Sequence, residues 1–121
     1  MQQDLFGICP YVTAQKLLTG KWTLLILHFL NGKTMRFGEL QRNLPDLTQA
    51  TLTKQLRLLE EHRLVARTVY SQIPPKVEYS LTELGRRFDP VLAELEAWGN
   101  LYIQDLRGKQ PSGTPAAIEI E

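Results

Sequence analysis

Cysteine, histidine and long apolar runs are scarce in this sequence, and each scarcity removes a class of protein. Cys9 is the only cysteine, so no disulfide can form within the chain. With only His28 and His62 beside it, no recognised zinc spacing can be assembled, and we expect no metal site. The most apolar stretch, LLILHFL at 24–30, is far too short to span a bilayer, so we expect a cytoplasmic protein. No Gly-rich phosphate loop and no acid, base and nucleophile series is present, which predicts neither an enzyme nor a cofactor.

Net charge is also nearly absent, but the charges are unevenly distributed. Residues 21–76 hold nine basic residues against four acidic ones, whereas residues 77–121 hold four basic against eight acidic. A basic segment beside an acidic one is expected when one face of a domain meets a polyanion. Chance scatter of solvated charges is the alternative. The 121 residues, 43% of them hydrophobic, are enough for one compact core, and we expect one domain over 1–106.

Hydrophobic spacing predicts helices first and a hairpin afterwards. Helices are expected from Pro10 to near Gly20, over 22–30, over a short stretch at 36–44, and over 48–61. The helix at 22–30 is apolar nearly all round, which predicts the buried centre of the domain. After residue 64 the apolar residues recur every second position, so strands at 65–72 and 76–81 should form a hairpin around IPP. Thr82 should cap a last long helix, in which Pro90 predicts a kink or a break into two helices, and a flexible tail should occupy 107–121.

The helix predicted at 48–61 has an unusual charge order. No acidic residue lies between Thr48 and Leu59, although the helix dipole favours acids in the first turn. DNA phosphate is the anion that we expect at this end of the helix. Leucines form its buried stripe, and the opposite side can reach base edges with Gln49, Ala50, Thr53, Lys54 and Arg57. The order of elements predicts a mainly α fold with a small β-hairpin wing (α+β), a winged helix-turn-helix.

Six short segments together resemble the HxlR-type family of bacterial winged-helix regulators, relatives of the MarR-type proteins. They are CP at 9–10, GKW at 20–22, RFGEL at 36–40, LTKQLRLLEEHRLVAR at 52–67, PPKVEYSLTELG at 74–85, and Trp98. The resemblance implies a homodimer in the bacterial cytoplasm, associated with the nucleoid, that binds double-stranded DNA at a two-fold operator. The helix at 48–61 would read the DNA and the hairpin around Gln72 to Lys76 would be the wing. Arg63 departs from the family pattern, which usually places Gly at that helix end.

Two sets of residues follow as candidate sites. The DNA-binding set comprises Lys33, Arg36, Thr48, Gln49, Ala50, Thr53, Lys54, Arg57, Arg67, Gln72 and Lys76. The last helix carries more large apolar residues than one domain should cover, so it should join the first helix in a dimer interface. The interface set comprises Val12, Leu17, Val91, Leu95, Trp98 and Tyr102.

Several alternatives stay open at this stage. The winged helix could instead be a protein-interaction module without sequence-specific DNA binding. Lys33, Arg36 and Arg67 are either phosphate clamps or solvated surface. The aromatic residues Trp22, Phe29, Phe37 and Tyr79 are most simply core, although they could line a cavity for a small effector. His28 is expected to be a buried histidine rather than a pH sensor.

Cys9 also allows two interpretations. It directly precedes Pro10, so its sulfur should lie at the positive end of the first helix, where a thiolate is stabilised. The resemblance implies that a cysteine near this position can sense an oxidant or an electrophile. The alternative is a small residue that only packs at a helix start. No membrane partner is expected.

Overall fold

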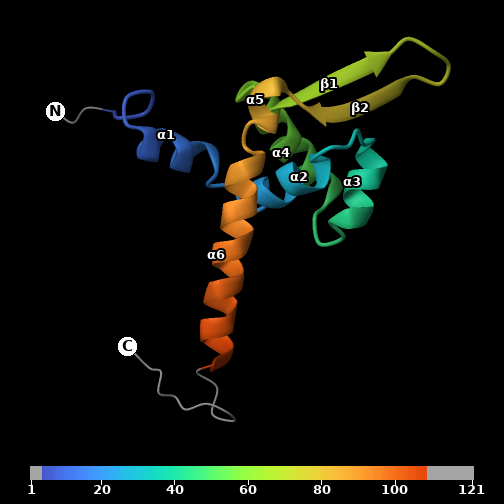
Figure 1. Cartoon of the computed structure of the whole chain (residues 1–121). Coiled ribbons are helices and arrows are strands. Elements are labelled where there is room, and N and C mark those ends of the chain that lie inside the picture. Colours follow the sequence, from blue (N-terminus) through green and yellow to red (C-terminus); the bar gives the residue numbers. More distant parts are fainter. Residues whose placement is uncertain (1–3, 109–121) are drawn as a thin grey trace. The chain divides into compact units, whose positions relative to one another are not determined.

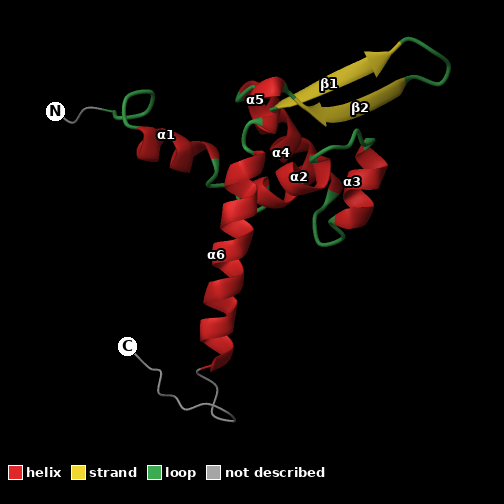
Figure 2. Cartoon of the chain, in the orientation of Figure 1, coloured by secondary structure: helices red, strands yellow, loops and turns green. Residues whose placement is uncertain are grey.

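The computed structural model describes residues 4–108 of the chain, and these form six helices and one two-stranded sheet (Figures 1 and 2). In chain order the elements are α1 Pro10–Leu17, α2 Thr23–Leu30, α3 Phe37–Asn43, α4 Gln49–Glu61, β1 Val65–Tyr70, β2 Lys76–Leu81, α5 Glu83–Arg86 and α6 Asp89–Gly108. The chain divides after Phe88 into two units. The first holds α1 to α5 and both strands, and α6 is described separately. The element order is that of a winged helix-turn-helix, as predicted.

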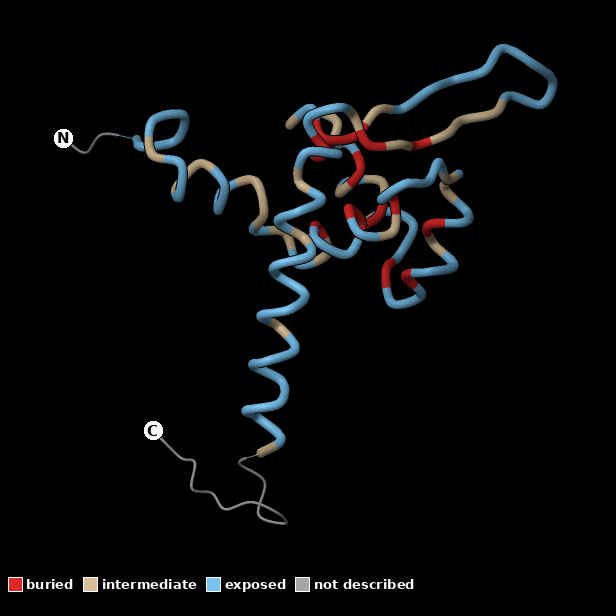
Figure 3. Tube along the Cα trace, viewed as in Figure 1, coloured by how far each residue is buried: buried red, intermediate tan, exposed pale blue. Residues whose placement is uncertain are grey.

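The core of the first unit is built almost entirely from branched aliphatic side chains. α2, α3, α4 and the turn at 44–47 contribute nine of them, and the hairpin contributes the rest, coloured as buried in Figure 3. The buried apolar residues are Ile26, Leu27, Leu30, Leu40, Leu44, Leu47, Leu52, Leu56, Leu59, Leu64, Val65, Tyr79 and Leu81. Because the leucines of α4 recur every three or four residues, they form one stripe, which fixes the opposite side of α4 toward solvent.

Both ends of α4 are defined by local chemistry. Thr48 caps its start, with Oγ1 accepting a hydrogen bond from the Thr51 main-chain N–H at 3.1 Å. At its end, the Leu64 N–H donates to the Leu59 carbonyl at 3.0 Å and the Arg63 N–H donates to the Glu60 carbonyl at 2.9 Å. This is a Schellman motif, and Arg63 has the left-handed φ of 65° that such a motif requires. Arg63 therefore occupies a conformation that favours Gly, and this lowers the stability of the fold by about 1 kcal/mol.

The hairpin pairs β1 and β2 in antiparallel register, from Val65 opposite Leu81 to Tyr70 opposite Lys76. A short bridge adds to it: the Met35 N–H donates to the Tyr79 carbonyl at 2.9 Å, and the Tyr79 N–H donates to the Met35 carbonyl at 2.7 Å. Since α3 begins two residues after Met35, this bridge fixes the first helix of the helix-turn-helix to the wing. The sequence pattern carried no signal for it.

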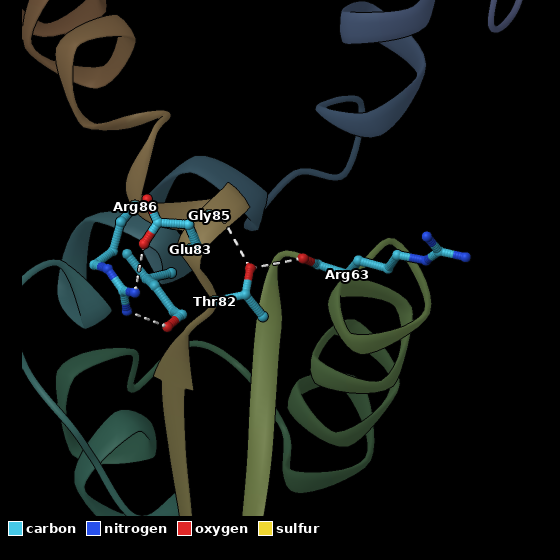
Figure 4. Close-up of polar contacts among 6 residues, drawn as sticks. Arg63, Thr82, Glu83, Gly85 and Arg86 are labelled. Atoms are coloured by element: carbon cyan, nitrogen blue, oxygen red, sulfur yellow. Dashed lines mark hydrogen bonds and ion pairs between the residues drawn. The ribbon is translucent and has the colours of Figure 1, made fainter.

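The base of the hairpin is joined to α5 through Thr82 (Figure 4). Its hydroxyl donates to the Arg63 carbonyl at 2.7 Å and accepts from the Gly85 N–H at 3.0 Å. Its own N–H donates to the Leu64 carbonyl at 3.1 Å. Arg86 adds a bond from Nη1 to the Leu81 carbonyl at 3.0 Å. Thr82 thus caps the helix that follows it, as predicted, and also binds the turn that ends α4.

Pro90 separates two helices rather than kinking one. α5 ends at Arg86 and α6 begins at Asp89, so Pro90 lies in the first turn of α6, where no backbone donor is needed. Of the two outcomes predicted for Pro90, the break is therefore correct. α6 continues to Gly108, two residues beyond the predicted end of the domain at 106. The remainder of the predicted tail, 109–121, lies outside the described residues.

Three predictions about the N-terminal helices are wrong. α1 ends at Leu17, before Gly20. α2 is not buried on all sides, because its buried residues Thr23, Ile26, Leu27 and Leu30 form one stripe and Leu24 and Leu25 are exposed. His28 falls outside that stripe and is exposed rather than buried.

The aromatic core prediction holds for one residue of four. Tyr79 is buried, whereas Trp22, Phe29 and Phe37 are only half-buried. Trp22 precedes α2 as its N-cap residue, and Lys21 lies over its ring with Nζ 5.1 Å from the centroid. The closely packed leucines leave little room for these larger side chains, which cover the edges of the core instead.

Candidate nucleic-acid interface

The outward side of α4 carries four of the five predicted base-reading residues in full exposure. Gln49, Ala50, Lys54 and Arg57 are exposed, and Thr53 is half-buried. The Thr53 hydroxyl donates to the Gln49 carbonyl at 2.9 Å, so only its lone pairs remain for a ligand. A shallow hollow of about 590 Å³ runs along this side, lined by Ala50, Thr53, Lys54, Arg57, Leu58 and Glu61. The predicted row is thus a continuous and accessible face, with donors and acceptors from the amide, hydroxyl, ammonium and guanidinium groups.

The N-terminus of α4 keeps its positive pole. Its first turn contains no acidic residue, and the Thr48 cap satisfies a single N–H, that of Thr51. Thr48 Oγ1 also donates to Thr51 Oγ1 at 2.9 Å, so this cap is a neutral pair of hydroxyls. The acids Glu60 and Glu61 lie at the opposite end. The helix therefore presents a positive end that no side chain of its first turn neutralises.

Arg57 on α4 and Arg67 on β1 lie around one open hollow of about 480 Å³, together with Glu60 and Glu61. The fold therefore brings two predicted DNA-binding arginines from separate elements to one place. The carboxylates of Glu60 and Glu61 on the rim of the hollow offset part of the positive charge of the two arginines. Glu60 and Glu61 were predicted to lie away from the DNA, and they mark where the positive part of the α4 face ends.

Of the two wing residues predicted to contact DNA, Gln72 lies in the loop beyond the ribbon and Lys76 is held against the ribbon. Gln72 is exposed in the loop between the strands. Lys76 is turned back along the ribbon: its Nζ lies 3.3 Å from Glu78 Oε2 and 4.8 Å from the centroid of the Tyr70 ring. Sequence spacing missed both partners, although alternation places Lys76 and Glu78 on one face and the register adds Tyr70. The ammonium group of Lys76 is therefore already engaged by Glu78 and Tyr70 in the absence of a ligand.

Lys33 and Arg36 are both exposed beside the start of α3. Lys33 follows Gly32, which ends the α2 turn with a left-handed φ of 70°. Arg36 is the residue before α3, where its main-chain N–H donates to Glu39 Oε1 at 2.8 Å. Glu39 therefore fixes the backbone of Arg36 without engaging its guanidinium, which remains exposed toward solvent.

The predicted interface residues belong to the two helices that bury nothing. α6 has no buried residue, and Val91, Leu95, Trp98 and Tyr102 are all exposed. Trp98 is 62% exposed and stacks on Tyr102 with ring centroids 5.5 Å apart, which fixes both rings on one side of the helix. α1 likewise has no buried residue, and its Val12 and Leu17 are half-buried.

Cys9 is a half-buried free thiol at the residue before α1. Its N–H donates to the Leu5 carbonyl at 2.8 Å. An aromatic-lined effector cavity was left open as an alternative, but the apolar hollow near the end of α1 is mostly aliphatic. It measures about 230 Å³ and is lined by Ala14, Leu17, Leu18, Leu64, Leu84, Arg87 and Phe88.

The described residues offer neither a cluster of metal ligands nor a membrane-spanning helix. Over residues 4–108 no group of three or more His, Cys, Asp or Glu side chains is arranged to hold a metal ion. No helix in that range combines the length and apolar character needed to cross a membrane.

Comparison with known proteins identifies the family. The model of the HxlR-like helix-turn-helix family matches residues 17–107. The chain is 46% identical over 100 residues to YdeP of Bacillus subtilis, described as an HTH-type transcriptional regulator, covering 82% of this chain and 77% of YdeP. The redox regulator HypR in its reduced form is 39% identical over 82% of this chain and 98% of that one, with a TM-score of 0.77. Quinone-bound YodB from B. subtilis is 33% identical over 77% and 99%, with a TM-score of 0.66. These relatives are regulators rather than enzymes, and the chain belongs to the HxlR-like helix-turn-helix family of transcriptional regulators.

Proposed function

We propose that the protein is a homodimer that binds a specific two-fold DNA operator through α4. The observation that carries the proposal is the outward face of α4, where four polar or small residues are exposed and no acid precedes Glu60. Its uncompensated N-terminus would bind a backbone phosphate, and Gln49 and Arg57 would contact base edges in the major groove. Lys33 and Arg36, both beside the start of α3, would hold further backbone phosphates, and Thr48 would lie beside the phosphate at the N-terminus of α4.

The exposed apolar surface of α6 supports the proposed second copy. A helix of 20 residues that carries Val91, Leu95, Trp98 and Tyr102 on its surface buries none of them within its own chain. Apolar surface of that extent is rarely left in water, so it is proposed to pack against the same helix of a partner chain. α1 would join this interface with Val12 and Leu17.

A protein-interaction module is the alternative reading of a winged helix. Such a module would offer apolar or acidic contacts on α4 and the hairpin. The tip of the hairpin does expose apolar side chains. The exposed residues of α4 and of the start of β1, however, include Lys54, Arg57 and Arg67, which favours a polyanionic ligand. Salt separates the two, because counterion release makes DNA affinity fall steeply as the salt concentration rises.

Two arginine variants test the proposed division between reading and holding. Arg57→Ala should lower the affinity for operator by roughly 1–3 kcal/mol more than the affinity for random duplex, because it removes a base contact. Arg36→Ala should weaken binding to both duplexes equally. It should also reduce the slope of log affinity against log salt by the amount expected for about one phosphate contact. The measurement is fluorescence anisotropy on both duplexes over a salt series, using an operator selected by the unaltered protein from random DNA.

The two arginines are matched controls for each other, since the same side chain and charge are removed. Equal loss on both duplexes for Arg57→Ala would reassign Arg57 to the DNA backbone. Failure of the unaltered protein to select any sequence, together with a salt-independent affinity, would favour the interaction module.

A thiol sensor is a second proposed function, favoured by the likeness to quinone-bound YodB and to the redox regulator HypR. Cys9 precedes α1, one of the two helices proposed to form the dimer interface. Its thiol would add to a ring carbon of a quinone, forming a C–S bond, and the thiol proton would go to one ring oxygen. The proton on the substituted carbon then moves to the other ring oxygen, which gives the hydroquinone thioether. The bulk added beside α1 would alter the angle between the two subunits and hence the distance between the two reading helices.

Benzoquinone treatment should therefore lower operator affinity at least about tenfold in the unaltered protein and leave Cys9→Ser unchanged. Cys9 is the only thiol, so mass spectrometry confirms its modification without ambiguity. Affinity that stays constant after complete modification would show that Cys9 only packs at the helix start.

A further inference from the structure

The tip of the wing carries no charge and exposes three large apolar side chains. From Thr68 to Pro75 no residue is charged. Ile73 is 99% exposed in the loop, and Val69 and Tyr70 at the end of β1 are 55% and 40% exposed. Figure 3 shows the outer end of the hairpin as exposed. A wing that held DNA by charge would need basic side chains at this end. The adjacent basic residue, Lys76, is already paired with Glu78.

The apolar surface surrounds the end of the ribbon. Val69 and Tyr70 are consecutive in β1, so their side chains lie on opposite faces. Ile73 lies in the loop beyond them, followed by Pro74 and Pro75, whose rings restrict the backbone. Apolar contact on both faces and at the end suits insertion into a narrow space rather than docking on a flat surface.

This tip is continuous with the proposed DNA-binding face. Arg57 on α4 and Arg67 on β1 lie around one hollow. Val69 follows Arg67 on the same face of β1, two residues nearer the tip. Six residues of strand extend the ribbon roughly 20 Å from its base. With α4 in the major groove, such a ribbon can reach the adjacent minor groove, which is about 6 Å wide and admits a loop tip but not a helix.

We propose that Ile73 is an apolar wedge that enters the minor groove and partly unstacks a base step there. Proteins that insert Ile, Leu, Phe or Pro between base pairs kink the duplex, and flexible pyrimidine–purine steps accept this most readily. Ile73 would therefore select sequence by deformability, and Gln72 beside it would contact the base edges. The inference rests on the proposed function, because it assumes that α4 lies on operator DNA.

Substitution of Ile73 tests the wedge on the full-length dimer. Ile73→Gln should lower operator affinity about tenfold, because the apolar contact is lost, while the slope of log affinity against log salt stays unchanged. Ile73→Leu should retain the affinity. Ser71→Gln is the matched control, since it adds the same amide to the same loop and keeps Ile73. 2-Aminopurine, whose fluorescence rises when it is unstacked, is placed at successive base steps flanking the half-site. Its fluorescence should rise at one step when the parent protein binds and should not rise with Ile73→Gln.

Each result of this experiment decides the proposal. Parental affinity and parental 2-aminopurine signal in Ile73→Gln would overturn the wedge and leave operator binding by α4 intact. A loss of affinity with a reduced salt slope would also overturn it, because the tip would then act on phosphates. A change in sedimentation with unchanged DNA affinity would assign the tip to a protein contact. Failure of the parent protein itself to prefer an operator would instead refute the proposed function.

Discussion

Gly85→Ala should destabilise the protein by about 3 kcal/mol or more, because no space exists for a methyl group at this position. A Cβ built on Gly85 would lie 2.2 Å from the Leu64 carbonyl oxygen and 3.4 Å from Leu81 Cβ. The oxygen belongs to the backbone and accepts the Thr82 N–H, so it cannot move without breaking that hydrogen bond. Overpacking against fixed atoms costs 1–3 kcal/mol and occasionally more. Urea unfolding followed by circular dichroism measures the change.

Gly38→Ala is the control for this prediction. Gly38 lies in the first turn of α3, and its nearest neighbour would be an Arg42 side-chain nitrogen at 3.7 Å, an ordinary contact. Alanine there should be neutral or stabilising by roughly 0.5–1 kcal/mol, as expected for a helical position. A Gly85→Ala variant as stable as the parent would mean that α5 does not pack on the Leu64 turn as described.

Trp98→Glu should convert the proposed dimer to a monomer and lower operator affinity by about 100-fold or more. Trp98 is among the most exposed large apolar residues of α6, and a carboxylate there would place an unpaired charge in the proposed interface. Loss of the second reading helix removes the gain from two linked half-sites, which is commonly 10²–10⁴. Sedimentation equilibrium at micromolar concentration and operator titration measure the two effects.

Asn100→Glu adds the same carboxylate to the opposite side of α6, about 200° around the helix from Trp98 at 100° per residue. It should leave both the sedimentation and the operator affinity near those of the parent. An Asn100→Glu variant that dissociates as fully as Trp98→Glu would indicate that charge on any side disrupts α6. A parent protein that sediments as a folded monomer would contradict the proposed dimer.

Local chemistry made most of the fold predictable from sequence. The leucine stripe of α4, the alternation of KVEYSL and the caps Thr48 and Thr82 act within a few residues of chain, so each appears directly as spacing. The left-handed position Arg63 was indicated by the family resemblance, which usually places Gly at that helix end. The outward face of α4, which we propose contacts DNA, followed once its buried stripe was known.

Features that depend on distant segments were not predictable in this way. The Met35 bridge joins residues 44 positions apart, and nothing in MRFGEL indicates an extended partner. His28 and Leu24 were assigned to the core because composition alone suggested it, whereas burial in α2 depends on which side faces α3 and β2. Lys76 was assigned to DNA without its partners, since the ring of Tyr70 becomes its neighbour only through strand register.

The double role of Thr82 couples α5 mechanically to the end of α4. One hydroxyl accepts from α5 and donates to the carbonyl at the end of α4, so these helices cannot rotate independently without breaking both bonds. Thr82 also donates its main-chain N–H to the Leu64 carbonyl, in the turn that leads into β1. A displacement of α5 within the first unit is therefore transmitted to the C-terminal end of α4 and to the base of the hairpin together.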